Sequence, residues 1–417
     1  MTYQAILRRQ IRYSLAVDLV HMLARIFNRL LDDSFEPEIR RNISIVTLGR
    51  LVANACYRFA PPFLAIIAKD FNVSLSDIGV AVFVSELSGF GSPLAGRIVD
   101  RLTHRNAMVI GLVGTILGCI IAALAPSVVW FAIGVTVLAL TKQSFDLGLG
   151  AWIADHVPYQ QRGRIVGLTE TSWALGLLIG VSLMGLITAA TNWRIGYLFG
   201  IICLALVTAP IAKHVNSEPR VVTPHVQGDK TRVQGRGWLV VVTMFCIMSC
   251  AQSLFVTFGA WLQDQFGFGA ARLAAVGFAL GAVELFASLN SAHRTDGWGK
   301  ERSIAGGALL IVPAGILLAL ASTNIVLGLI AVGMYYLGFE FAVVSLLPIA
   351  TQLVPNSPGM GLGWVLGAGT LGRAIIAIVG TRAYEKYGVD VPALIGSGFG
   401  VLAAISILTY KKLGETH

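Results

Sequence analysis

The sequence predicts an all-α membrane protein with twelve transmembrane helices in two six-helix repeats, preceded by an amphipathic N-terminal helix. Three observations support this fold class: the composition, a series of long apolar segments, and a correspondence between the two halves of the chain. Of the 417 residues, 55% are hydrophobic and 13% are charged, and the mean hydropathy is +0.74. A soluble domain carries about 25% charged residues. The composition therefore excludes a soluble enzyme, a disordered chain, a collagen and a disulfide scaffold.

Twelve apolar segments account for most of the chain. A helix that crosses the hydrocarbon core needs about 20 apolar residues, and the segments approach or exceed that length. The expected spans are 44–68, 76–97, 107–126, 128–153, 165–189, 195–213, 238–263, 271–291, 303–322, 325–353, 360–380 and 391–410. Before them, residues 4–31 have the spacing of an amphipathic helix. We expect this helix to lie on the inner leaflet, or alternatively to pack across the inner mouth of the bundle.

The basic residues predict the orientation of these spans. With the N-terminus inside, the segments on the cytoplasmic side hold 22 of the 31 Lys and Arg residues, and the opposite side holds five. An excess of basic residues on the cytoplasmic side is typical of membrane proteins. We therefore expect a multi-pass protein of the bacterial cell (inner) membrane with both termini in the cytoplasm. The net charge of +9 is thus explained by the basic residues that set the orientation of the protein in the membrane. We therefore expect the lipid bilayer as a partner and no nucleic acid.

The two halves of the chain repeat one another. Glu86 corresponds to Glu284 at an offset of 198 residues, and Asp100 corresponds to Asp296 at an offset of 196. A Val-Pro pair downstream recurs at an offset of 197. Offsets that agree within two residues indicate an internal duplication. The expected domains are a cytoplasmic extension at 1–43, six-helix bundles at 44–213 and 238–410, a cytoplasmic linker at 214–237 and a cytoplasmic tail at 411–417.

Nine acidic or basic side chains lie within the expected spans and away from the span ends. A charge at the bilayer centre costs at least about 2.5–3.5 kcal/mol, so each needs a partner or a water-filled path. Spans three, six, nine and twelve carry none away from their ends. The nine residues are Arg50, Arg58, Glu86, Lys142, Asp146, Glu170, Glu284, Glu340 and Arg373.

Four polar residues of the first span share one helix face. Arg50, Asn54, Tyr57 and Arg58 follow at i, i+4, i+7 and i+8. One hypothesis makes this face a cationic, hydrogen-bonding wall for substrate; the alternative neutralises each arginine with a carboxylate from another helix and assigns it to packing. The next residues, Pro61-Pro62, interrupt the hydrogen-bond ladder and predict a kink.

Further residues are expected to contact substrate. Lys142, Gln252 and Arg373 complete the expected binding set, and Trp173, Tyr335 and Tyr336 offer aromatic surface. Lys142 also lies four residues before Asp146, a spacing that favours an ion pair within one helix.

The acidic residues within the spans are candidates for carrying a proton. Burial in a low-dielectric cavity favours the neutral form of a carboxyl group, which suits loading and releasing a proton near neutral pH. Glu340, in the middle of the tenth span, is the first choice, followed by Asp146 and then by Glu86, Glu284 and Glu170. Structural alternatives make Glu340 the permanent counter-ion of Arg50 or Arg373 and make Glu170 an interfacial residue.

Several motifs resemble those of a known family. The segment Gly96-Arg-Ile-Val-Asp100-Arg101-Leu-Thr-His-Arg105 resembles the loop signature Gly-x-x-x-Asp-Arg/Lys-x-Gly-Arg-Arg/Lys of the major facilitator superfamily (MFS). A degenerate copy follows at Asp296-Gly-Trp-Gly299-Lys300, and the segment around Asp155 resembles the end of the family's fourth helix. Thr103 and His104 depart from the loop signature, and Val181 stands where the family's antiporter motif has Pro.

The resemblance implies an MFS fold and a secondary transporter that works by alternating access, with a small-molecule substrate and protons as partners. Among known members the chain looks similar to drug-efflux transporters, which implies proton-coupled export (antiport) of amphiphilic organic molecules. The alternatives are proton-coupled uptake of an organic anion by a symporter and transport of lipid. The residues implied to hold the cytoplasmic gate are Gly96, Arg97, Asp100, Arg101, Arg105, Asp155 and Asp296.

Other function classes lack support in the sequence. No ATP-binding loop, dinucleotide fingerprint, nucleophile elbow or metalloprotease motif is present. We therefore expect no enzyme activity, no cofactor and no metal site, and we expect a monomer.

Overall fold

The described part of the chain is helical throughout. The computed structural model describes residues 37–91, 102–157, 159–215, 233, 235–354 and 358–415. No strand occurs among these residues. The N-terminal segment expected to be amphipathic, 4–31, and most of the expected linker at 214–237 lie outside the described residues.

The chain divides into two compact units. Unit 1 comprises Met1–Phe59, Gly91–Pro126 and Ile133–Val222, and unit 2 comprises Ala60–Phe90, Ser127–Ala132 and Thr223–His417. The domain boundaries expected from the sequence follow the internal duplication rather than the packing, and they stay a prediction. Each unit is described by itself below.

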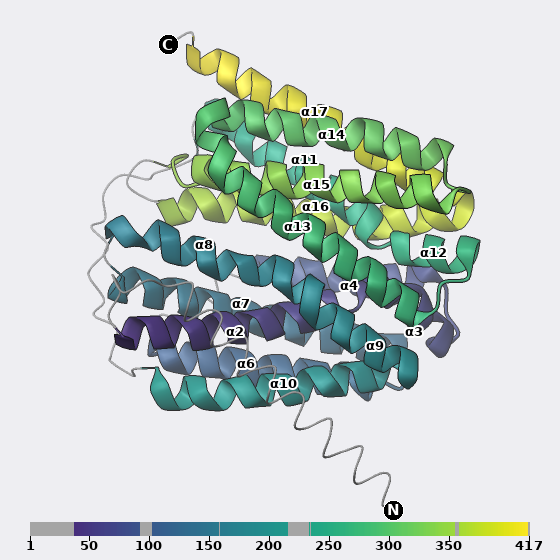
Figure 1. The fold of residues 1–417 in the computed structure, drawn as a ribbon, viewed down its shortest axis with the longest axis horizontal. Helices are drawn as coiled ribbons and strands as arrows, with labels where there is room; N and C mark the ends of the chain where they lie inside the picture. The colour runs from purple at the N-terminus through teal and green to yellow at the C-terminus, as the bar shows by residue number, and fades with distance from the viewer. Residues whose placement is uncertain are drawn as a thin grey trace, which may run out of the picture. The chain divides into compact units, whose positions relative to one another are not determined.

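Unit 1 is built from helices that lie side by side (Figure 1). They are α2 (Pro37–Arg58), α6 (His104–Ala123), most of α7 (Val128–His156), α8 (Tyr159–Leu175), the π-helical turn η3 (Gly176–Val181), α9 (Ser182–Ala190) and α10 (Trp193–His214). Helix α2 is central, because it packs against α10, α8 and η3. Gly176 of η3 allows the close approach, since a Cβ atom there would lie 2.9 Å from the Cβ of Asn54.

Unit 2 contains the remaining helices. They are the 3-10 turn η1 (Pro61–Phe63), α3 (Leu64–Phe71), α4 (Leu75–Leu87), α11 (Gly237–Phe255), α12 (Phe258–Phe266), α13 (Ala270–Trp298), α14 (Lys300–Leu320), α15 (Ile325–Ala350), α16 (Pro358–Tyr387) and α17 (Asp390–Glu415). Helix α14 packs against α15 and α17, α11 packs against α16 and α17, α13 packs against α15, and α4 packs against α16.

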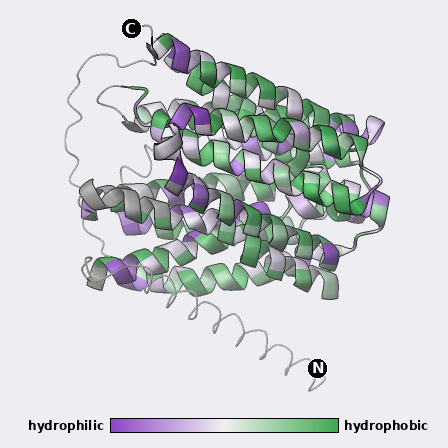
Figure 2. Cartoon of the chain, turned by 45° about the horizontal axis from the view of Figure 1, so that its top comes forward, coloured by the Kyte–Doolittle hydropathy of each residue, from purple (hydrophilic) through white to green (hydrophobic). Residues whose placement is uncertain are grey.

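The helices have the length and composition of membrane spans. Within the described residues, 11 helical segments are long and apolar enough to cross a membrane. Hydrophobic residues run along the helices of both units (Figure 2). The expected span 76–97 begins as α4 and continues through the 3-10 turn Ser88–Gly91, after which the chain lies outside the described residues. The prediction of an all-α membrane protein is confirmed.

The interruption of the first span predicted at Pro61-Pro62 is present. Helix α2 ends at Arg58, and the 3-10 turn Pro61–Phe63 separates it from α3. Proline at 61 and 62 removes two backbone donors from the ladder, which explains why the α-helix stops there.

Candidate functional site

The polar face predicted on the first span packs against α8. The contacts occur in the same order along α2 and along α8. The contacts are Arg50 Nη1 donating to the Thr169 carbonyl (3.0 Å), Asn54 Nδ2 donating to Ser172 Oγ (3.2 Å) and Arg58 Nη1 donating to the Trp173 carbonyl (3.0 Å). The spacing on α2 therefore predicted the shared face, whereas the partner helix was not predictable from it.

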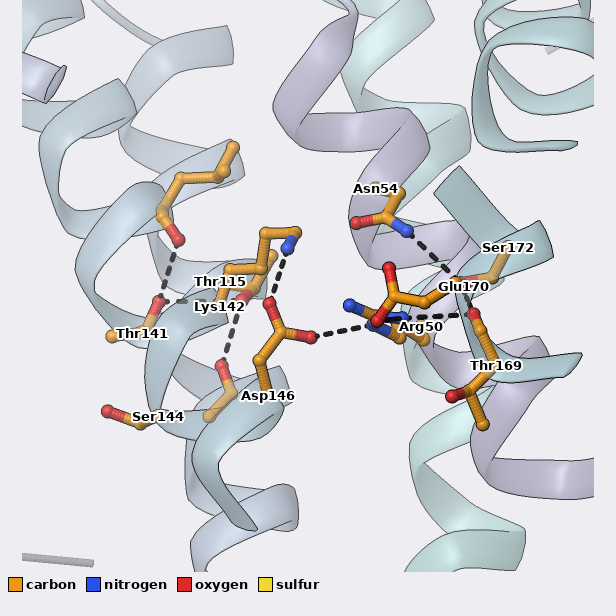
Figure 3. A network of polar contacts seen from close by, with 12 residues as sticks. Arg50, Asn54, Thr115, Thr141, Lys142, Ser144, Asp146, Thr169, Glu170 and Ser172 are labelled. Atoms are coloured by element: carbon orange, nitrogen blue, oxygen red, sulfur yellow. Dashed lines mark hydrogen bonds and ion pairs between the residues drawn. The ribbon is translucent and has the colours of Figure 1, made fainter. Parts of the chain in front are cut away.

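Arg50 lies at the centre of an ion-pair network (Figure 3). Its Nε contacts Oδ1 of Asp146 at 3.0 Å, and its Nη1 contacts Oε1 of Glu170 at 2.8 Å. The other oxygen of Asp146, Oδ2, contacts Nζ of Lys142 at 2.6 Å. The ion pair predicted between Lys142 and Asp146 within one helix is thus confirmed. Asp146 binds two cations, one with each oxygen, and is 28% exposed, whereas Glu170 is 48% exposed.

Two aromatic rings lie beside the cations of this network. The guanidinium carbon of Arg58 lies 4.5 Å from the centroid of the Trp173 ring. The ammonium nitrogen of Lys142 lies 5.6 Å from the Tyr57 ring and 5.9 Å from the Trp173 ring. The two ring centroids are 6.3 Å apart. These distances permit cation–π attraction, which acts within about 6 Å of a ring centroid.

We call the seven residues Arg50, Asn54, Tyr57, Arg58, Lys142, Asp146 and Trp173 the cation–aromatic cluster. It combines guanidinium and ammonium groups with two flat apolar surfaces. Chemically, such a cluster can bind an organic molecule through its aromatic part and through a negatively charged group.

A second ion pair joins α4 to α16 in unit 2. Arg373 Nη2 contacts Oε1 of Glu86 at 2.6 Å, and the side chains are 20% and 8% exposed. The same two helices meet again nearer the start of α4, where a Cβ atom at Gly79 would lie 3.0 Å from the Ala377 carbonyl oxygen. The alternative to substrate binding was that each buried arginine pairs with a carboxylate from another helix. Arg373 and Arg50 both have such a partner in the structure.

Two further glutamates lie buried in unit 2. Glu340 on α15 is 5% exposed and Glu284 on α13 is fully buried. The hydroxyl of Ser288, one turn after Glu284 on α13, donates to Oε1 of Glu340 at 2.6 Å. Gln252, expected at the binding site, lies on α11 and is 2% exposed. Its role in substrate binding stays a prediction.

Both departures from the loop signature have a structural role at the start of α6. Thr103 caps the helix, because its Oγ1 accepts a hydrogen bond from the backbone nitrogen of Asn106 at 3.2 Å. His104 Nε2 contacts Oδ2 of Asp155 at 2.7 Å. The sequence places Asp155 among the gating residues but does not indicate its contact with His104.

The other expected gating residues are only partly placed. Gly96, Arg97, Asp100 and Arg101 lie outside the described residues, and Arg105 lies in the first turn of α6. Asp296 lies in the last turns of α13, and its side chain is outside the described part of the chain. The gate therefore stays a prediction.

The family assignment follows from comparison of the whole chain with known proteins. The family model described as "Major Facilitator Superfamily" matches residues 46–377. The chain belongs to this superfamily. Members are transporters of small molecules, so the chain is a multi-pass membrane transporter and not an enzyme. The resemblance drawn from the loop motif is confirmed.

A curated relative shares most of its length with this MFS transporter. It is the uncharacterized MFS-type transporter YwfA of Bacillus subtilis (strain 168), which is 26% identical over 382 residues, covering 89% of this chain and 92% of the relative.

Solved MFS structures share the fold. A bacterial homologue of the human lysosomal transporter Spinster, inward-facing and unoccupied, superposes with a TM-score of 0.74 at 13% identity, covering 91% of this chain and 98% of the other. The D-xylose–proton symporter gives 0.72 at 17% identity, with 88% and 97% coverage. The human organic anion transporter MFSD10 (TETRAN) gives 0.66 at 17% identity, with 89% and 100% coverage. At these identities the likeness shows the fold alone.

Proposed function

We propose that this MFS protein is a proton-coupled secondary transporter that exports amphiphilic organic molecules by alternating access. The observation that carries the proposal is the cation–aromatic cluster, in which Arg58 lies 4.5 Å from the Trp173 ring and Lys142 lies within 6 Å of two rings. A molecule with both an aromatic part and a polar group matches these surfaces. A small hydrophilic substrate would use the hydrogen-bonding groups and leave the rings unused.

Proton coupling is supported by the charges within the spans of unit 2. Away from the span ends, the sequence there carries three glutamates, Glu86, Glu284 and Glu340, and a single arginine, Arg373. Arg373 contacts Glu86 at 2.6 Å. Burial in an apolar environment favours the neutral form of a carboxyl group, so glutamates at this depth suit the loading and release of a proton. We assign the coupling proton to Glu340, which lies near the middle of α15 and accepts a hydrogen bond from Ser288.

Asp146 is a weaker proton carrier than the sequence suggested. It contacts both Arg50 and Lys142 at 3.0 Å or less. Two adjacent cations favour the ionised form of a carboxylate, so a proton would have to compete with both of them. We therefore assign Asp146 to holding the cation–aromatic cluster in place.

A second candidate function is proton-coupled uptake of an organic anion. It is favoured by the charges within the spans of unit 1, where the sequence away from the span ends has three cations, Arg50, Arg58 and Lys142, and two carboxylates, Asp146 and Glu170. The excess of one positive charge favours an anionic substrate. One protein with the same fold is described as an organic anion transporter, and another as a proton symporter.

The first experiment is a thermal-shift screen of the purified full-length protein. The probes are fluorescein as an amphiphilic aromatic anion, ethidium as an amphiphilic aromatic cation and sucrose as a hydrophilic control. A ligand at 100 times its Kd stabilises by about 2.7 kcal/mol. We expect an amphiphile to raise the melting temperature and the variant Trp173→Leu to weaken the effect. Trp130→Leu is the matched control, because Trp130 on α7 is 51% exposed.

The second experiment measures flux of the bound probe into proteoliposomes under pH gradients of both polarities. Antiport predicts accumulation when the lumen is more acidic than the bath, because protons leave as substrate enters. Symport predicts accumulation when the bath is more acidic. A flux that ignores both gradients would contradict proton coupling, and stabilisation by sucrose alone would contradict an amphiphilic substrate.

The orientation and the gate belong to the same proposal. We place the protein in a bacterial cell membrane with both termini in the cytoplasm. The transporting unit is a monomer. We assign the closing of the cytoplasmic gate to the loop residues Arg97, Asp100, Arg101 and Arg105, with Asp155 near His104 and with Asp296 from the second repeat. Cysteine labelling of the tail from either side of the membrane tests the orientation.

A further inference from the structure

A group of hydroxyl side chains lies between α13 and α15 in unit 2. Three of them form a closed triangle of hydrogen bonds, and a fourth contacts Glu340. The distances are 2.9 Å from Ser291 to Ser345, 2.9 Å from Thr295 to Ser345, 3.1 Å from Ser291 to Thr295 and 2.6 Å from Ser288 to Glu340. We call Ser288, Ser291, Thr295 and Ser345 the hydroxyl ladder.

The ladder follows one face of α13. Glu284, Ser288, Ser291 and Thr295 occupy i, i+4, i+7 and i+11, which is a single face of a helix. Helices α13 and α15 run in the same predicted direction, so both Thr295 and Ser345 lie nearer than Glu340 to the end that the sequence places in the cytoplasm. The ladder therefore extends from mid-depth toward that end.

Many buried hydroxyls among the described residues bond within their own helix. Thr243, for example, donates to the carbonyl of Leu239 four residues earlier, at 2.7 Å. Ser and Thr in apolar helices commonly satisfy themselves this way. Ser291, Thr295 and Ser345 instead bond to one another across two helices, and they are 0%, 6% and 1% exposed.

A hydroxyl can carry a proton because it donates and accepts at once. When a proton arrives at one oxygen, that oxygen releases its own proton to the next, and no charge stays on the chain. Each hydroxyl of the triangle has two neighbours within hydrogen-bond reach. Ser288 and Ser291 lie three residues apart, which on a helix places their Cβ atoms about 5–6 Å from each other. A rotated side chain or one water spans that step.

We propose that the hydroxyl ladder carries protons between Glu340 and the cytoplasmic end of α13 and α15. Thr295 and Ser345 exchange protons with the cytoplasm, Ser291 passes them on, and Ser288 delivers them to the carboxylate of Glu340. The net reaction moves one proton from hydronium to a carboxylate and leaves every hydroxyl neutral. The inference rests on the proposed function, because it takes Glu340 as the proton site.

Other titratable groups lie on the helices that pack against α15. Away from the helix ends, α13 brings Glu284, α11 brings Cys246 and Cys250, and α16 brings Arg373; at its first turn α14 brings Lys300, Glu301 and Arg302. Removing the hydroxyl of Ser345 or Thr295 changes none of these charges and leaves the hydrogen bond from Ser288 to Glu340 in place. These two hydroxyls therefore affect the rate at which Glu340 binds a proton and leave the pH midpoint of that binding unchanged.

The test follows the protonation of Glu340 by infrared spectroscopy in inside-out membrane vesicles, where the bath contacts the cytoplasmic face. The band of the protonated carboxyl group is assigned by its loss in Glu340→Gln. After a rapid acid jump in the bath, we expect the double variant Ser345→Ala with Thr295→Val to slow the band's appearance at least about tenfold, since a positioned proton donor contributes factors of that size or more. The midpoint should stay at the wild-type pH.

Three controls make the result specific. Thr243→Val removes a buried hydroxyl outside the ladder and should keep the wild-type rate. Ser345→Thr retains a hydroxyl and should also keep it. The single variant Ser345→Ala, which leaves the bond between Ser291 and Thr295, provides the test if the double variant does not fold.

Each other outcome overturns the inference at a distinguishable point. An unchanged rate in the ladder variants shows that protons reach Glu340 by another route. An unchanged rate with a shifted midpoint shows that the hydroxyls act only on the equilibrium. A wild-type spectrum with no band that depends on Glu340 removes this residue as the proton site, which overturns the ladder together with the assignment of the coupling proton to Glu340.

Discussion

The ion pair between Glu86 and Arg373 yields a prediction about stability that needs no substrate. The atoms are 2.6 Å apart, and the side chains are 8% and 20% exposed. Removing one partner of a buried pair costs about 3–5 kcal/mol, because it leaves an uncompensated charge. Glu86→Gln removes this carboxylate from the guanidinium of Arg373, which cannot lose its proton. We expect a loss of about 3 kcal/mol, at the low end of the range because Arg373 retains some exposure.

The reverse change should cost less. Arg373→Met leaves a carboxylate, and a carboxyl group in an apolar environment can bind a proton and become neutral. Combining both changes removes both charges, and replacement of a buried pair by uncharged groups is often neutral. We therefore expect the stability of the double variant to lie within about 1 kcal/mol of the wild type. This loss is much smaller than the sum of the losses in the two single variants.

The assay is equilibrium unfolding of the purified protein in mixed micelles with increasing denaturing detergent, applied to all four proteins of the cycle. Asp264→Asn is the control, because Asp264 is exposed and accepts a bond from Tyr384 that Asn also accepts; its effect should stay within about 0.5 kcal/mol. Additive single losses, or a loss below about 1 kcal/mol for Glu86→Gln, would refute the buried ion pair.

Three further predictions concern unit 1 and the gate. Asp146→Asn leaves two cations without their shared carboxylate and should destabilise by about 3–5 kcal/mol, whereas Glu170→Gln, at a side chain 48% exposed, should cost less than about 1 kcal/mol in the same unfolding assay. Gly118→Ala places a Cβ atom 2.5 Å from a backbone nitrogen of α7 and should cost about 1–3 kcal/mol, while Gly150→Ala, with open space around it, should cost nothing. Asp100→Asn should reduce flux in proteoliposomes while melting like the wild type; wild-type flux would contradict the gating role.

Much of the fold was predictable because membrane spans depend on local composition. A helix in lipid must satisfy its own backbone, so length and hydropathy identify it without knowledge of its neighbours. The break at Pro61-Pro62 was predictable for the same reason, since proline acts on its own helix. The packing of α4 against α16 was not, because it joins segments almost 300 residues apart that share no local pattern.

The candidate site was predictable where its chemistry is local. The spacing of Lys142 and Asp146 predicted their ion pair, and the structure has it at 2.6 Å. The partners of Arg50 lie 96 and 120 residues away, and the sequence offered several carboxylates without a way to choose among them. Only the packing of α2 against α7 and α8 selects Asp146 and Glu170.

The hydroxyl ladder was missed altogether. Single Ser and Thr residues in apolar helices carry no charge and usually bond within their own helix, so they gave no signal of a shared function. The helical spacing of Ser288, Ser291 and Thr295 after Glu284 was the available clue. Its meaning depends on Ser345 and Glu340, which belong to a helix that begins some 30 residues later.

The measurement that tests the account most directly is the transport phenotype of Glu340→Gln. The change keeps size and hydrogen bonding but removes the proton site. We predict a protein that folds and binds the amphiphilic probe found by thermal shift, and that exchanges it downhill, yet no longer accumulates it under an imposed pH gradient. Accumulation driven by the gradient at the wild-type level would contradict the account, because the proton would then be carried elsewhere.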